Sequence, residues 1–76
     1  MDTSNHTMQA LFAQLGLSNS ELAIENFVHN NHLPREIPLE SAAFWSIGQA
    51  QFIRESIALD ADWAEVVDHL DAMLRH

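Results

Sequence analysis

Apolar residues recur at helical spacing in four separate segments of this chain, and this periodicity restricts the chain to an all-α fold. In the first segment they fall at i, i+3, i+4 and i+7, on one face of a helix, as Met8, Leu11, Phe12 and Leu15. Thr7 precedes this face and is a typical N-cap residue. Gly16 follows it and favours the left-handed conformation that ends many helices. The pattern therefore predicts a short helix over residues 8–15.

The second segment begins where Ser18 and Glu21 have the spacing of a capping box, in which the two side chains satisfy each other's backbone N–H groups. Leu17 and Leu22 have the spacing of the hydrophobic staple that accompanies this motif. We expect a helix that ends near Asn30, before the first proline. Its buried stripe should consist of Ala23, Ile24, Phe27 and Val28.

The third segment has the broadest apolar surface. Ser46 and Gln49 form a second capping box, and the helix should run to about Leu59. One side of it carries Ile47, Ala50, Ile53 and Ile57. Phe52 and Leu59 lie well round from that side, so the apolar surface is wider than one neighbouring helix would cover. We therefore expect this helix either to be central in the fold or to contact another chain.

The fourth segment starts near residues 60–62, where aspartates suit the positive end of the helix dipole. Its apolar face consists of Trp63, Val66, Val67, Leu70, Met73 and Leu74. Its opposite face consists of Asp62, Glu65, Asp68 and Asp71. Alternation of this kind predicts a helix with one buried and one solvated side.

Between the second and third helices, Pro34 and Pro38 push the residues before them out of helical geometry. Apolar side chains in this stretch predict a loop that lies against the core. The sequence thus predicts a single helical domain over residues 1–76. Its architecture should be a compact bundle of four helices, in which two helical pairs are joined by the proline-containing loop.

The charge balance excludes several classes of partner. Eleven Asp and Glu residues accompany three Arg and no Lys, which gives a formal net charge of −8 at pH 7. Such a surface repels nucleic acid phosphates and anionic lipid headgroups, so we expect binding to neither nucleic acid nor membrane. The polar N-terminal residues lack the apolar run of a signal peptide, and we expect a cytoplasmic protein.

The chain has no pattern typical of a catalytic or cofactor site. There is no cysteine, which excludes thiolate metal sites, and Gly16 and Gly48 stand alone, which excludes a glycine-rich phosphate loop. We therefore expect no enzymatic activity and no cofactor. His29 and His32 lie three residues apart near the end of the second helix. Two histidines hold a metal ion only together with a third ligand. The alternative hypothesis is therefore a small metal-binding protein that uses these histidines and nearby carboxylates.

Four parts of the chain have distinctive sequences: residues 1–7 (MDTSNHT), 11–17 (LFAQLGL), 44–45 (FW) and 60–67 (DADWAEVV). In this order they resemble a family of short bacterial proteins catalogued only as a domain of unknown function. The resemblance covers nearly the whole chain. It implies a small stand-alone helical protein and brings no activity, ligand or catalytic residue with it.

The lack of reactive groups and the surplus apolar surface favour a non-enzymatic protein-interaction or regulatory module. Apolar and aromatic residues dominate binding hot spots, and the predicted interaction surface consists of Phe44, Trp45, Phe52 and Leu59. The partner would be another protein or a second copy in a homodimer. A third hypothesis, an acidic mimic of nucleic acid that occupies a basic partner, depends on charge alone and predicts binding that weakens with salt.

Overall fold

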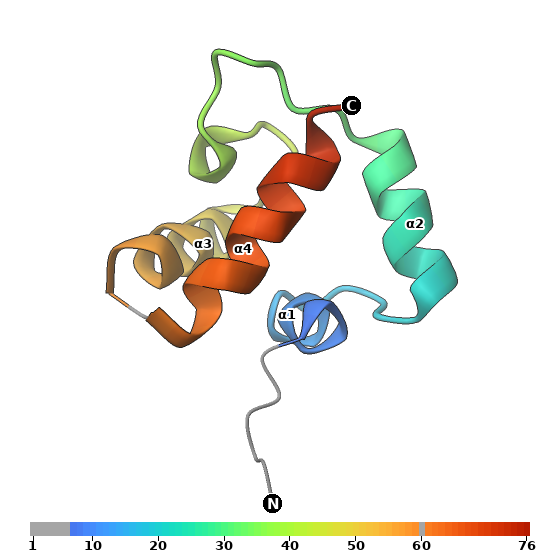
Figure 1. Ribbon diagram of the computed structural model, residues 1–76, viewed down its shortest axis with the longest axis horizontal. Helices are drawn as coiled ribbons and strands as arrows, with labels where there is room; N and C mark the ends of the chain where they lie inside the picture. The colour runs from blue at the N-terminus through green and yellow to red at the C-terminus, as the bar shows by residue number, and fades with distance from the viewer. Residues whose placement is uncertain (1–6, 60) are drawn as a thin grey trace, which may run out of the picture.

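The computed structural model describes residues 7–59 and 61–76, and the regular elements in these ranges are all helical (Figure 1). They are α1 (Met8–Gln14), α2 (Glu21–Asn30), the short 3-10 helix η1 (Leu39–Ser41), α3 (Ile47–Leu59) and α4 (Ala61–Leu74). The predicted all-α class and the bundle of four helices are confirmed. None of the helices in these ranges combines the length and the apolar character needed to cross a bilayer.

The ends of α1 follow the sequence prediction. The Thr7 hydroxyl accepts a hydrogen bond from the Ala10 N–H at 3.1 Å, which caps the start of the helix. Gly16 has a φ of 74° just past the end. There the N–H groups of Gly16 and Leu17 donate to carbonyls of the last turn, in the Schellman arrangement that satisfies the final backbone groups of a helix.

The start of α2 differs from the prediction. Ser20, not Ser18, is the N-cap, and its hydroxyl accepts from the Ala23 N–H at 3.1 Å. The side chain of Asn19, which precedes this cap, donates to the Gln9 carbonyl of α1 at 3.2 Å. The predicted staple is also wrong, because Leu22 is 67% exposed.

The capping box of α3 is confirmed, since the Gln49 N–H donates to the Ser46 hydroxyl at 3.1 Å and the Ser46 N–H donates to the Gln49 amide oxygen at 2.9 Å. The Gln49 amide nitrogen also donates to the Leu15 carbonyl at 2.8 Å. The buried residues of α3 are Ile53 and Ser56. Ile47, which lies on the apolar side described from the sequence, is 86% exposed.

The central helix is α4, which packs against α1, α2 and α3 (Figure 1). By contrast, α3 packs mainly against α4 and η1, so the prediction of a central third helix is wrong. Its alternative, that α3 contacts another chain, stays a prediction. The buried side of α4 consists of Trp63, Val67, Leu70 and Leu74. Residue 60, where the start of this helix was expected, lies outside the described residues.

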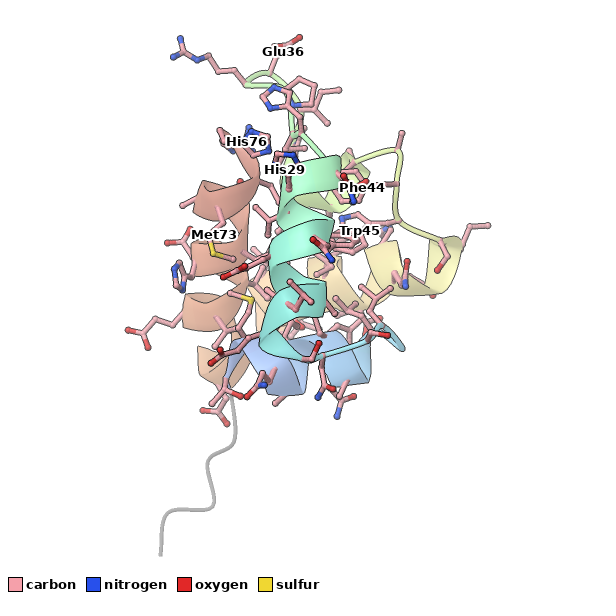
Figure 2. The ribbon with its side chains drawn as sticks, turned by 90° about the vertical axis from the view of Figure 1, so that its right-hand side faces the viewer. His29, Glu36, Phe44, Trp45, Met73 and His76 are labelled. Carbon is pink, nitrogen blue, oxygen red and sulfur yellow. The ribbon has the colours of Figure 1, made fainter. Side chains whose placement is uncertain are left out.

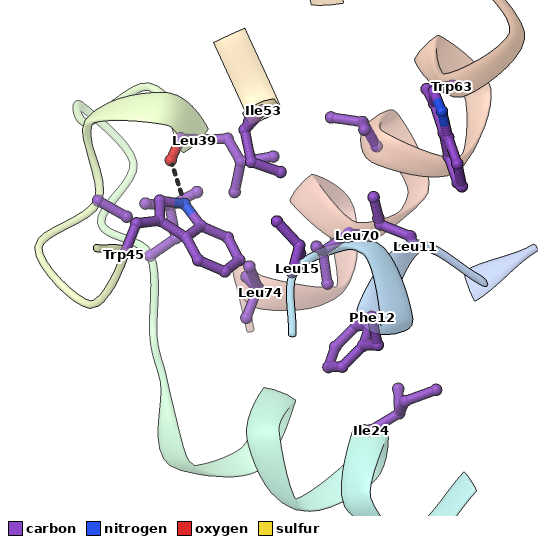
Figure 3. Packing of buried hydrophobic residues seen from close by; sticks show 13 residues of the cluster. Leu11, Phe12, Leu15, Ile24, Leu39, Trp45, Ile53, Trp63, Leu70 and Leu74 are labelled. Atoms are coloured by element: carbon purple, nitrogen blue, oxygen red, sulfur yellow. Dashed lines mark hydrogen bonds between the residues drawn. The ribbon is translucent and has the colours of Figure 1, made fainter. Parts of the chain in front are cut away.

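The proline-containing loop lies against the core, as predicted. Leu33 and Leu39 are buried, and the Leu33 N–H donates to the Leu74 carbonyl at 2.8 Å. The indole nitrogen of Trp45 donates to the Leu39 carbonyl at 2.8 Å (Figure 3). This buried bond connects η1 to the residue that precedes the α3 cap. The loop is thus attached to the rest of the fold at both of its ends.

Candidate interaction surface

Two of the four predicted surface residues, Phe44 and Trp45, pack inward toward α2. The centroid of the Phe27 ring lies 5.6 Å from each of their ring centroids, edge-on to Phe44 and stacked on Trp45. Phe44 is half-buried. Trp45 is 8% exposed and belongs to the hydrophobic core, so it offers almost no surface to a partner.

The other two residues lie seven positions apart on α3 and differ in exposure. Phe52 is half-buried and packs edge-on against Trp63 of α4, with ring centroids 5.9 Å apart. Leu59 is 82% exposed at the end of α3. Of the predicted surface, Leu59 is therefore the side chain most available to a partner, and binding at this surface stays a prediction.

The histidines near the ends of α2 and α4 contact each other and the backbone. Figure 2 shows His29 and His76 near one another where these two helix ends meet. The rings of His32 and His76 are 5.3 Å apart, and His76 Nε2 lies 2.9 Å from the Val28 carbonyl oxygen. Among the residues that the structure describes, no three His, Asp or Glu side chains converge as metal ligands, so the alternative metal site at His29 and His32 gains no support.

A groove of about 600 Å³ runs between α3 and α4, which lie side by side in Figure 1. Its apolar lining comes from both helices: Ile57 is 49% exposed, Ala64 is half-buried and Val67 is buried. The sequence placed Ile57 on one apolar side of its helix. The structure buries the neighbouring Ser56 and leaves Ile57 at the edge of this groove.

The polar lining of this groove is entirely acidic and consists of Glu65, Asp68 and Asp71, spaced three residues apart along α4. Arg75 forms an ion pair with Asp71, with 2.5 Å between Nε and Oδ1. Within the described residues, neither Glu65 nor Asp68 forms an ion pair with a basic side chain. Two uncompensated carboxylates therefore border the apolar strip.

Comparison with known proteins places the chain in a family. A family model described as "Protein of unknown function (DUF2789)" matches residues 1–74. The chain belongs to the DUF2789 family. It is also similar to the solution NMR structure of protein CV0237 from Chromobacterium violaceum, with 44% sequence identity, a TM-score of 0.82, and coverage of 99% of this chain and 95% of that chain. Comparison with curated proteins gave no match.

This DUF2789 chain has a second groove, of about 430 Å³, between α2 and α4. Its lining consists of Ile24, Glu25, Val28, His29, Met73 and His76. Its polar side chains are one carboxylate and two imidazoles, whereas every polar side chain that lines the groove between α3 and α4 is a carboxylate.

Sequence reasoning about this DUF2789 chain missed the groove between α3 and α4. The periodicity assigns Ile57 to one apolar side of its helix and Glu65 and Asp68 to a solvated face of the next helix, and nothing local indicates that they are neighbours. They become neighbours when α3 packs on α4. The signal that pointed this way was the excess apolar surface of the third helix.

Proposed function

We propose that this DUF2789 chain is a non-enzymatic interaction module that binds a segment of a partner protein along the groove between α3 and α4. The observation that carries the proposal is the position of Ile57, a large aliphatic side chain left 49% exposed beside the buried Val67. Apolar surface bordered by polar groups is typical of protein-binding sites. A partner side chain packed against Ile57 would remove it from water.

The lining of the groove supports binding over catalysis. Its polar side chains are three carboxylates of one helix, and no serine, histidine or arginine side chain lines it. Carboxylates repeated along one helix face suit the polar rim of an interface.

The occupant that fits is another protein and not a second copy of this chain. A two-fold symmetric dimer brings the same patch of both subunits together. Here that arrangement would bring Glu65 and Asp68 of one copy toward the same acidic rim of the other, between two chains of net charge −8. Like charges brought together in an interface cost several kcal/mol.

The test is capture of a partner by the full chain and by two aspartate variants of α3, from a lysate of the organism that encodes it. Ile57→Asp places a charge in the groove. Ile47→Asp is the matched control, since Ile47 is 86% exposed on the same helix and does not line the groove. The proposal expects a protein that binds the unmodified chain and the control at a 1:1 ratio by calorimetry, and binds Ile57→Asp at least tenfold more weakly.

Two results would overturn the proposal. One is a partner whose affinity is the same for both aspartate variants. The other is a solution mass of twice 8.6 kDa that returns to 8.6 kDa in Ile57→Asp, because a second copy would then occupy the groove. Far-UV circular dichroism of each variant confirms that the helices are retained, so that a loss of binding reports on the groove.

A further inference from the structure

We infer that the segment bound between α3 and α4 is a basic amphipathic helix, with Lys or Arg side chains directed at Glu65 and Asp68. The inference rests on the proposed function and adds the chemistry of the partner. It starts from the groove itself, in which an apolar strip from two helices is bordered by carboxylates from one of them. The occupant must therefore offer apolar side chains on one face and cations along its edge.

The positive charge of the partner follows from the local balance of charge. Glu65 and Asp68 are three residues apart on α4, so their side chains are neighbours on the helix surface. Like charges at this spacing destabilise a helix. Asp71, the next carboxylate along the groove, has Arg75 as its counter-ion. A cation of the partner would be the counter-ion of Glu65 and Asp68, as Arg75 is the counter-ion of Asp71.

The helical form of the partner follows from its backbone. An extended peptide gains affinity by adding its main chain to an exposed sheet edge, and residues 7–59 and 61–76 contain no strand. The groove is formed by two packed helices, so its walls are side chains. A helix satisfies its own backbone hydrogen bonds and can dock an apolar stripe into such a groove. Its anchors would lie at i, i+3 or i+4, and i+7 and meet Ile57 and the half-buried Ala64.

The experiment uses two synthetic peptides of about 15 residues, a length near which isolated helices become stable. Both carry the same stripe of leucines, with lysines on the polar face of one and glutamines at the same positions of the other. Each is titrated into the full chain, and affinity and the perturbed backbone amides are measured by NMR at low and high salt. We expect the lysine peptide to bind more tightly, to perturb α3 and α4, and to weaken as salt rises.

Matched variants separate the groove from the overall charge of the protein. Glu65→Gln/Asp68→Asn removes two charges beside the groove, and Glu25→Gln/Glu36→Gln removes two exposed charges that do not line it. We expect the first pair to weaken the lysine peptide about fivefold or more, since two exposed ion pairs are lost. The second pair should weaken it less than twofold. Equal effects of the two pairs, or equal affinity of the two peptides, would overturn the inference.

The two proposals fail separately. If Ile57→Asp abolishes binding of the natural partner but the lysine peptide does not prefer the groove, the groove is an interface and the basic helix is wrong. If the lysine peptide binds and Ile57→Asp leaves its affinity unchanged, the peptide does not occupy the groove and the inference is equally overturned.

Discussion

Arg75, the first residue after α4, forms an ion pair with Asp71 of that helix, with 2.5 Å between Nε and Oδ1, and the same guanidinium group also holds the proline-containing loop. Its Nη1 donates to the carbonyls of Pro34 and Arg35 at 2.8 and 3.2 Å, and its Nη2 donates to the Ile37 carbonyl at 3.0 Å. Asp71 positions the guanidinium by binding the one N–H that points back along the helix. One side chain therefore fixes a loop about 40 residues away in sequence.

We expect Arg75→Met to lower the free energy of unfolding by about 2 kcal/mol, because a hydrogen bond to a charged group contributes roughly 1.5–3 kcal/mol and this side chain is partly exposed. Urea unfolding measures the change. Hydrogen exchange should become faster at the Leu33 N–H, which bonds to Leu74 beside this loop. Arg54→Met, on an exposed part of α3, is the control and should change stability by less than about 0.5 kcal/mol. Similar losses for both variants would contradict the prediction.

Two serines before α2 allow a direct test of where that helix starts. Ser20→Ala should lower stability by about 1 kcal/mol, because the hydroxyl that accepts from the Ala23 N–H is removed. Ser18→Ala should leave stability nearly unchanged. Thermal unfolding followed by circular dichroism compares the two variants. A larger loss in Ser18→Ala would show that the helix begins two residues earlier.

The two glycines should respond to alanine with opposite signs. Gly16→Ala should destabilise by about 1–2 kcal/mol, since its φ of 74° is unfavourable for a residue with a β-carbon. Gly48→Ala should stabilise by about 0.5 kcal/mol, because it lies in the first turn of α3 and a β-carbon there meets no atom within 4 Å. The denaturant midpoints of the two variants, compared with that of the unmodified chain, should show that one variant is less stable and the other more stable.

Trp45→Phe tests the buried hydrogen bond to η1. We expect a loss of about 1–2 kcal/mol, because the Leu39 carbonyl loses its indole donor while it keeps the N–H of Ala42 at 3.1 Å. The stacking partner Phe27 should keep most of its contacts, so the helical circular dichroism of the folded state should not change. A loss below about 0.5 kcal/mol in urea unfolding would show that the bond contributes little.

The sequence predicted a helix end correctly where only one capping residue or motif was available nearby. Thr7, Gly16 and the pair Ser46–Gln49 act within a few residues, and the structure shows each of them in its expected role. The start of α2 was wrong because Ser18 and Ser20 are both good caps. The sequence around them does not choose between the two, and it does not show that Asn19, between them, bonds to α1 ten residues away.

The candidate surface could not be predicted from periodicity, because the rotation of α3 depends on a distant contact. Gln49 reaches the carbonyl of Leu15, 34 residues earlier, and this bond accompanies the burial of Ser56 in place of Ile57. A helix with apolar residues on several sides has several possible buried faces, and the pattern alone does not choose among them. The sequence correctly predicted that the acidic residues of α4 share one face of the helix. It did not predict that Ile57 of α3 lies across the groove from this face.

The central position of α4 has a consequence for synthesis in the cell. The helices α1, α2 and α3 are translated before α4. Their apolar faces therefore cannot pack against α4 until the ribosome has added residues 61–74. At about 5–20 residues per second, this delay lasts roughly one to three seconds. During that interval the nascent chain presents open hydrophobic surface, and this is the period in which chaperones would have access to it.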